Sequence, residues 1–92
     1  MSTLAADLEA LLRRDLAPRE LGLRDDSAAH AGHAGARQGA HFAVRIVSSR
    51  FTGLKPLQRH RLVYAAAAPL LPARIHALQI DALTPEETGD PR

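Results

Sequence analysis

The chain of 92 residues is long enough for one domain with a modest hydrophobic core and too short for two. It contains no cysteine, which excludes disulfides and thiolate ligands of its own, so histidine is its strongest metal-binding side chain. No apolar run reaches the length of a membrane span, and the N-terminal residues do not have the pattern of a signal peptide. We therefore expect a soluble cytoplasmic protein with no membrane partner.

The formal net charge of +2 hides an uneven distribution of charge along the chain. Residues 27–80 contain seven of the twelve Lys and Arg residues and all five histidines, whereas all ten acidic residues lie outside this segment. Eleven of the twelve bases are arginines, which favour bidentate contacts with carboxylate or phosphate. The segment predicts a surface that binds anions or acidic proteins in a salt-sensitive way.

Apolar residues recur at helical spacing near the N-terminus, at Leu4, Leu8, Leu11 and Leu12. This spacing predicts an amphipathic helix over about residues 3–16, with Ser2 or Thr3 as its N-terminal cap. Pro18 stops its continuation.

Two strands separated by a loop are predicted next. Leu21 and Leu23 alternate across Gly22, which indicates a short strand that suits a sheet edge. Residues 28–40 combine Gly, Ala and two histidines without periodicity, so we expect a mobile surface loop whose histidines can reach a partner. Residues 41–47 alternate large apolar and smaller or polar side chains and predict the clearest strand.

A helix is predicted in the second half, after a turn or a single helical turn over residues 48–53. Pro56 suits a first helical position, and the helix should run to about Ala68. Three of its positions are expected to face a sheet: Leu57, either Leu62 or Val63, and Ala67. Arg59 and part of the triplet Arg59–Arg61 should point to water, although one of the three is expected to pack or brace the turn that carries Phe51. Core positions are also expected at Phe51, Val63 and Tyr64.

A third strand is predicted over Ile75–Leu83, in which His76, Leu78, Ile80 and Ala82 share one face. Thr84-Pro85-Glu86-Glu87 has the pattern of a capping box, but only five residues follow. The last helix should therefore be stunted, with a frayed or disordered tail at about residues 88–92. The element order predicts a single α+β domain with helices packed on one face of a three-stranded sheet.

The chain resembles the BolA family over about residues 4–87. The matching residues are His41-Phe42, Ser48-Ser49-Arg50-Phe51, Gly53, Leu57, Arg59-His60-Arg61, Val63-Tyr64, His76-Ala77-Leu78 and Thr84-Pro85-Glu86-Glu87. The resemblance implies a class II KH-like fold with the order αββααβα. Departures are the loop residues 37–40, which lack the acidic or hydroxyl residues common there, and the absence of the usual tryptophan-bearing C-terminal helix.

The resemblance implies pairing with a monothiol glutaredoxin through a bridging [2Fe-2S] cluster, shared with glutathione and not expected in the isolated protein. It places one cluster ligand on His76 and a second on His30, with His33 as a close rival. Glutaredoxin and glutathione would supply the thiolates for one iron, because this chain has none. The structural alternative for His76 is a half-buried strand histidine bonded to backbone, and for the loop histidines it is solvent exposure.

The resemblance also implies a second activity, transcriptional regulation through DNA. Its contacts would come from the helix-turn-helix-like part around Phe51–Tyr64, through Arg50, Lys55, Arg59, His60 and Arg61. The Gly-x-x-Gly loop of KH domains is absent from the matching position, which argues against RNA.

Other function classes are weaker. An enzyme is not expected, because Ser48 and Ser49 have no acid in the central region with which to form a triad. The His-x-x-His spacing of the loop gives only two ligands for zinc or copper. A metal-free adaptor for an acidic protein and a weak homodimer stay open.

Overall fold

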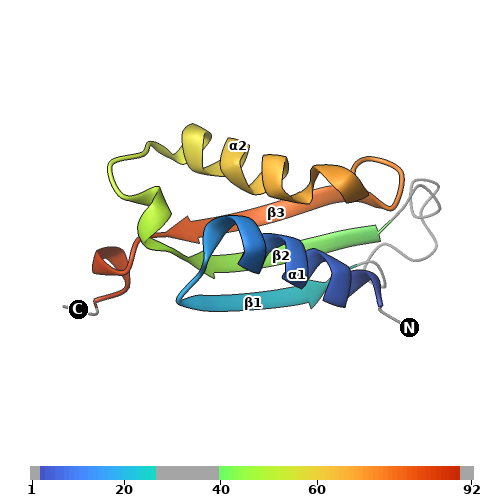
Figure 1. Cartoon of the computed structure of the whole chain (residues 1–92), viewed down its shortest axis with the longest axis horizontal. Helices are drawn as coiled ribbons and strands as arrows, with labels where there is room; N and C mark the ends of the chain where they lie inside the picture. Colours follow the sequence, from blue (N-terminus) through green and yellow to red (C-terminus); the bar gives the residue numbers. More distant parts are fainter. Residues whose placement is uncertain (1–2, 27–39, 90–92) are drawn as a thin grey trace.

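The computed structural model describes residues 3–26 and 40–89. Two helices, α1 (Leu4–Leu16) and α2 (Pro56–Ala67), accompany three strands, β1 (Glu20–Asp25), β2 (Ala40–Val47) and β3 (Ile75–Leu83) (Figure 1). The strands form one sheet in the order β1-β2-β3, in which β1 is antiparallel and β3 parallel to β2. The predicted α+β class is confirmed, with a mixed sheet.

Three short 3-10 turns complete the described chain: η3 (Ser49–Phe51), η4 (Ala68–Leu70) and η5 (Glu86–Thr88). The first and last of these stand where the order αββααβα implied further helices. Among the described residues, no helix is both long and apolar enough to cross a membrane.

The first helix begins and ends where the sequence predicted. The Thr3 hydroxyl accepts a hydrogen bond from the Ala6 N–H at 3.0 Å, so Thr3 is the N-cap. The helix ends at Leu16, after which Ala17 adopts a left-handed conformation before Pro18. Leu8 and Leu12 are fully buried, because the helical spacing places them on the face that meets the sheet.

One hydrophobic core lies between the helices and one face of the sheet. Phe42, Val44 and Ile46 of β2 supply its floor, and α1 covers them with its buried leucines. Helix α2 adds Val63, Ala66 and Ala67 to the same cluster, so both helices pack on that face as predicted. In the described part of the chain, no helix covers the opposite face (Figure 1).

Two buried residues, Phe51 and Ser48, hold the turn between β2 and α2 in place. Phe51 is fully buried in η3, as predicted for this core position. The buried Ser48 hydroxyl donates to the Leu16 carbonyl at 2.6 Å and accepts from the Arg50 N–H at 3.1 Å. These bonds satisfy a buried polar group and tie the turn to the end of α1.

Helix α2 is rotated relative to the prediction. Val63 and Ala67 are buried as expected, but Leu57 is 61% exposed and Tyr64 is 41% exposed, so their assignments to the sheet side and the core were wrong. Each residue turns the helix by about 100°, and a buried stripe along Val63, Ala66 and Ala67 puts Leu57 and Tyr64 on its flank. The Tyr64 hydroxyl still donates to the Leu78 carbonyl at 3.3 Å.

The C-terminal capping box is confirmed. The Thr84 N–H donates to Glu87 Oε1 at 2.8 Å, and the Glu87 N–H donates to Thr84 Oγ1 at 3.3 Å. As expected for a stunted helix, only the 3-10 turn η5 follows, and it ends at Gly89 with φ of +86°. The last three positions of the predicted tail, 90–92, lie outside the described residues.

Candidate functional site

A β-bulge sets the direction of the His76 side chain. Ala40 pairs with Ile75 and the next residue, His41, pairs with Ala77, so His76 is one extra residue in β3. Ile75 is fully buried and His76 is exposed, whereas strict alternation had placed His76 on the same face as the buried Leu78. The predicted shared face was therefore wrong at His76, because an extra residue at a bulge re-aims its side chain.

His41 lies beside His76. Their ring centroids are 5.3 Å apart and the rings are tilted by 56°. Strands β2 and β3 are parallel, so both begin at the same end of the sheet, and each histidine lies near the start of its strand. Sequence reasoning did not single out His41 as a site residue. The signal that could have found it is the parallel pairing of the two strands.

The predicted loop ligands, His30 and His33, lie outside the described residues. The residues that flank their segment are described, and both lie at the histidine end of the sheet. The Asp26 N–H donates to the His41 carbonyl at 2.7 Å, and the Ala40 N–H donates to the Arg74 carbonyl at 3.3 Å. Asp26 and Ala40, the described residues on either side of positions 27–39, thus lie near His41 and His76.

The described residues suit a shared metal site better than a self-sufficient one. Among residues 3–26 and 40–89, no group of three or more His, Cys, Asp or Glu side chains is placed to hold a metal ion. His76 and His41 provide two imidazoles at one surface, and imidazole nitrogen is a good ligand for iron. This donor set fits a cluster only if a partner brings further ligands.

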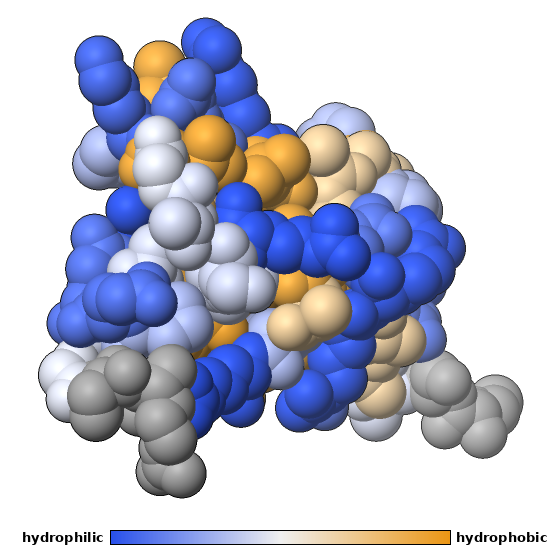
Figure 2. All heavy atoms as spheres, turned by 60° about the vertical axis from the view of Figure 1, so that its left-hand side comes forward, coloured by the Kyte–Doolittle hydropathy of each residue, from blue (hydrophilic) through white to orange (hydrophobic). Residues whose placement is uncertain are grey.

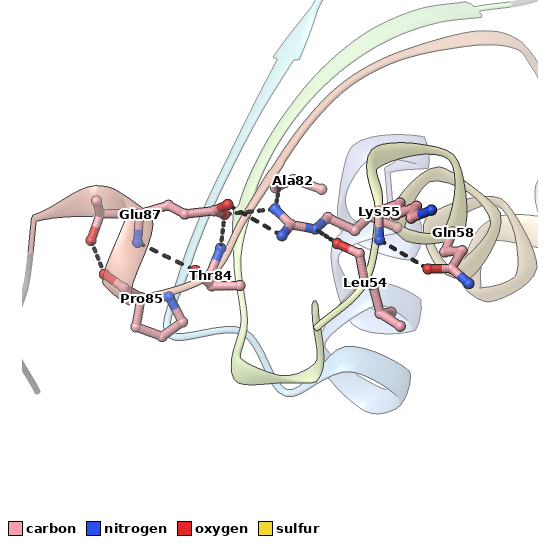
Figure 3. Close-up of polar contacts among 9 residues, drawn as sticks. Leu54, Lys55, Gln58, Ala82, Thr84, Pro85 and Glu87 are labelled. Atoms are coloured by element: carbon pink, nitrogen blue, oxygen red, sulfur yellow. Dashed lines mark hydrogen bonds and ion pairs between the residues drawn. The ribbon is translucent and has the colours of Figure 1, made fainter. Parts of the chain in front are cut away.

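Arg59 is enclosed, contrary to the expectation that it would face water. Its side chain is only 12% exposed, and its guanidinium donates to the Leu54 carbonyl at 2.9 Å and the Ala82 carbonyl at 3.1 Å. It also reaches both Glu87 oxygens, at 2.6 and 3.2 Å, as the dashed lines to Leu54, Ala82 and Glu87 indicate in Figure 3. Arg59 is thus the member of the triplet that braces the turn after Phe51. It is not available to DNA phosphates without breaking these bonds.

Glu87 completes this network from the C-terminal side. Hydrogen bonds from Arg59 and then from the Thr84 backbone N–H stabilise its carboxylate, and they lower its pKa from 4.5 to about 2. One carboxylate therefore links β3, η5 and the start of α2 (Figure 3). No local sequence pattern predicts the pair, because Arg59 and Glu87 are 28 positions apart.

The remaining predicted DNA contacts are exposed at the surface: Arg50, Lys55, His60 and Arg61. Within the described part of the chain, none of these four side chains forms a salt bridge, although Arg50, after Arg14, helps to lower the pKa of Asp15. By contrast, α1 pairs Arg13 with Glu9 and Arg14 with Asp15. Figure 2 shows the end of the molecule that carries the turn before α2, where apolar atoms emerge among hydrophilic ones. The exposed Leu57 lies on α2, which follows this turn.

A family model described as BolA-like protein matches residues 12–87. The chain belongs to the BolA-like family. The matched segment contains both histidines of the bulge region, Arg59 and Glu87, so the whole described site lies within the family domain.

BolA-like protein 1 from Homo sapiens is 49% identical over 82 residues, which cover 89% of this chain and 58% of the relative. BolA-like protein 1 from Pongo abelii is 47% identical, and this chain spans only 61% of its length. A DNA-binding transcriptional regulator, BolA of Escherichia coli, is 39% identical over 80 residues, covering 87% of this chain and 74% of the regulator.

Solved BolA structures share the fold. BolA1 from Arabidopsis thaliana superposes with a TM-score of 0.80 at 40% identity, covering 95% of this chain and 97% of that one. The BolA domain of SufE1 from the same plant gives 0.82 at 39% identity, covering 95% and 98%. The second of these is a BolA domain within a larger protein, and the names of these relatives describe BolA-like proteins, a SufE1 domain and a DNA-binding regulator.

Proposed function

We propose that this BolA-like chain is a non-enzymatic cytoplasmic partner of a monothiol glutaredoxin. The two proteins would share a bridging [2Fe-2S] cluster in iron–sulfur trafficking or iron sensing. The observation that carries the proposal is the bulge at His76, which turns an imidazole outward beside His41. A bulge that exposes a histidine is expected where that side chain serves a partner.

The ligands would divide between the partners. This chain has no cysteine, so the glutaredoxin and glutathione would provide the thiolates for one iron. His76 and a loop histidine, His30 or His33, would bind the other iron through neutral imidazole nitrogens. Ligation of one iron by histidine raises the reduction potential of a [2Fe-2S] centre relative to ligation by cysteine alone.

The serines that could act as nucleophiles give no support to an enzymatic role. The Ser48 hydroxyl is fully buried and is bonded to the Leu16 carbonyl and the Arg50 N–H. Ser49 is exposed, but residues 27–80 contain no acid that could orient a base beside it. A binding role is therefore the better account of this surface.

The test is anaerobic reconstitution with a monothiol glutaredoxin, glutathione, iron and sulfide, followed by native mass and visible circular dichroism. Wild type should form a heterodimer that carries one [2Fe-2S] cluster. His76→Ala should lose the histidine-dependent spectrum or the complex. His60→Ala is the matched control, because it removes an exposed histidine from the outer side of α2 and should change neither. A complex that is indifferent to His76→Ala would refute the ligand assignment.

The second ligand can be assigned with the same spectra. His30→Ala, His33→Ala and His41→Ala should be compared singly under identical reconstitution. We expect a loop variant to alter the spectrum as strongly as His76→Ala. A change confined to His41→Ala would instead move the second ligand to the residue that lies beside His76.

DNA binding is the second candidate, and the exposed bases Arg50, Lys55, His60 and Arg61 favour it. The Escherichia coli relative is named a DNA-binding regulator. Phosphate contacts by these side chains predict an affinity that falls steeply with salt and does not depend on His76.

The DNA candidate is tested by the salt dependence of binding to duplex DNA. Replacing Arg50, Lys55 and Arg61 together by Ala should flatten the plot of log affinity against log salt by about 0.9 for each phosphate that is no longer neutralised. Arg13→Ala on α1 is the control, since Arg13 is paired with Glu9. If the triple variant binds DNA with an unchanged salt slope, this surface is excluded as the DNA-binding site.

A further inference from the structure

Strand β1 is an edge of the sheet. The order β1-β2-β3 pairs one side of β1 with β2, and no strand in the described chain pairs with its other side. Figure 1 shows β1 along the lower border of the sheet. An edge strand exposes backbone N–H and C=O groups that can bind another strand.

The antiparallel register shows which groups are exposed. The Asp26 N–H donates to the His41 carbonyl, so this pair is hydrogen-bonded, and the pairs Arg24 with Ala43 and Gly22 with Arg45 follow at every second position. The alternate residues, Leu21 and Leu23, therefore direct their N–H and C=O groups outward. Glu20, Gly22 and Arg24 place their side-chain positions on the sheet face opposite the core.

Charge selects one register for pairing with a second copy. If Gly22 lies opposite its symmetry mate, Leu21 can exchange both backbone hydrogen bonds with Leu23 of the other copy. The same register sets Glu20 opposite Arg24 twice, at non-hydrogen-bonded positions where side chains lie closest. If one strand is shifted by two residues in one direction, Glu20 lies opposite Asp26 of the other copy. If it is shifted by two residues in the other direction, Glu20 lies opposite Gly22 of the other copy. Both shifted registers lose the opposite-charge pairs.

The surroundings permit this contact. The Glu20 and Arg24 side chains are 52% and 71% exposed, so both can reach a second copy. Glu20 is bonded to Arg45 through an exposed ion pair, which contributes little to stability. Gly22 has no atom within 4 Å of the position of a Cβ, so the two-fold axis would meet open space. On the opposite face, the half-buried Leu21 and Leu23 would extend the core cluster across the contact.

We propose that β1 is a self-association edge, at which two copies of this chain join antiparallel strands around Gly22 into one six-stranded sheet. The contact is isologous, so every interaction occurs twice. The charges of β1 serve two purposes: Glu20 and Asp26 oppose the register that sets them against each other, and Glu20 and Arg24 attract each other in the register around Gly22. The contact is centred on Gly22, and neither Glu20 nor Arg24 is a proposed cluster ligand or DNA contact, so the proposal does not depend on the proposed function.

The experiment is sedimentation equilibrium of the isolated protein over a wide concentration range, at low and high salt. Wild type should show a monomer–dimer equilibrium that weakens with salt. Glu20→Arg and Arg24→Glu should each raise the dissociation constant of the dimer at least about tenfold, because both symmetric pairs change from attraction to repulsion. Thermal unfolding followed by circular dichroism verifies that each variant is folded.

The decisive sample is an equimolar mixture of Glu20→Arg and Arg24→Glu. One chain then has two bases and the other two acids, so the mixture should dimerise although each variant alone does not. The ion pair within one chain between Glu20 and Arg45 cannot explain this rescue, since the Glu20→Arg chain still lacks it. A wild type that stays monomeric at all concentrations, a dimer that ignores both reversals, or a mixture without rescue would each overturn the proposal.

Discussion

The polar side chains at the two ends of β3 differ in exposure: those at one end are bonded within the fold, and His76 at the other end is exposed. Where the strand ends, the Ala82 carbonyl and the carboxylate of Glu87 are both bound by Arg59, which is itself enclosed. Where the strand begins, a bulge turns His76 outward, and its ring lies beside the ring of His41. The first end is the closed end, because its polar groups form hydrogen bonds within the protein. The second is the open end, because the His76 side chain is exposed there.

This difference separates a structural polar group from a functional one. An arginine that donates to three groups within the fold stabilises the fold, and its removal takes a donor away from each of them. An exposed imidazole contributes little to stability, so its direction needs another explanation. The comparison predicts that mutations at the closed end change stability, whereas mutations at the open end change binding.

Among the polar side chains at the two ends of β3, the largest effect on stability is expected for Arg59→Ala. The Leu54 and Ala82 carbonyls and Glu87 would each lose the donor that Arg59 provides, which should lower the free energy of unfolding by about 2–4 kcal/mol. Urea unfolding at neutral pH measures this. Arg61→Ala is the control, because Arg61 is exposed on the same helix and should change stability by less than about 0.5 kcal/mol. Equal losses in the two variants would contradict the structural role of Arg59.

The Arg59–Glu87 contact should also make stability depend on acid. The pKa of Glu87 is lowered from 4.5 to about 2, so its contribution is complete above about pH 4.5 and is lost as the pH falls towards 2. Glu87→Gln removes this contribution, and its difference in unfolding free energy from wild type should therefore shrink over that range. Glu86→Gln keeps the contact and should lose stability in acid as wild type does. A constant difference between Glu87→Gln and wild type would exclude the linkage.

A smaller loss is expected for Gly53→Ala in the turn that leads to α2. Gly53 has φ of +79°, a conformation that costs a residue with a Cβ about 1 kcal/mol. Gly22→Ala is the matched control, since neither glycine has an atom within 4 Å of its Cβ position and only Gly53 has a positive φ. Chemical denaturation should show a loss at Gly53 alone, and a similar loss at Gly22 would refute backbone strain as the cause.

The smallest effect on stability is expected at the open end. His76→Ala should change the free energy of unfolding by less than about 0.5 kcal/mol, because the side chain is exposed. Its neighbour Ile75 is fully buried, and Ile75→Ala should cost about 2–5 kcal/mol. A loss at His76 as large as that at Ile75 would show that the histidine is structural.

Local patterns predicted most of the fold. The helical spacing of the N-terminal leucines, the alternation in β2 and the capping box at Thr84 all depend on residues within a few positions of each other, and the structure contains each of them. Candidate residues were less predictable. The exposure of His76 depends on the bulge, Arg59 is enclosed by partners that include the sequence-distant Glu87, and His41 lies beside His76 because β2 and β3 are parallel.

The sequence by itself determined the element order and the α+β class, because propensity, capping and periodicity are local properties that the chain carries wherever it folds. The family followed from the match of individual residues to the family pattern. Only the tertiary structure decided the rotation of α2, the enclosure of Arg59 and the meeting of His41 with His76. Strand register and long-range partners depend on how whole elements pack, and a shift of one residue moves a side chain to the other face. The bases and histidines of the described residues therefore divide into structural and accessible groups only after the chain has folded.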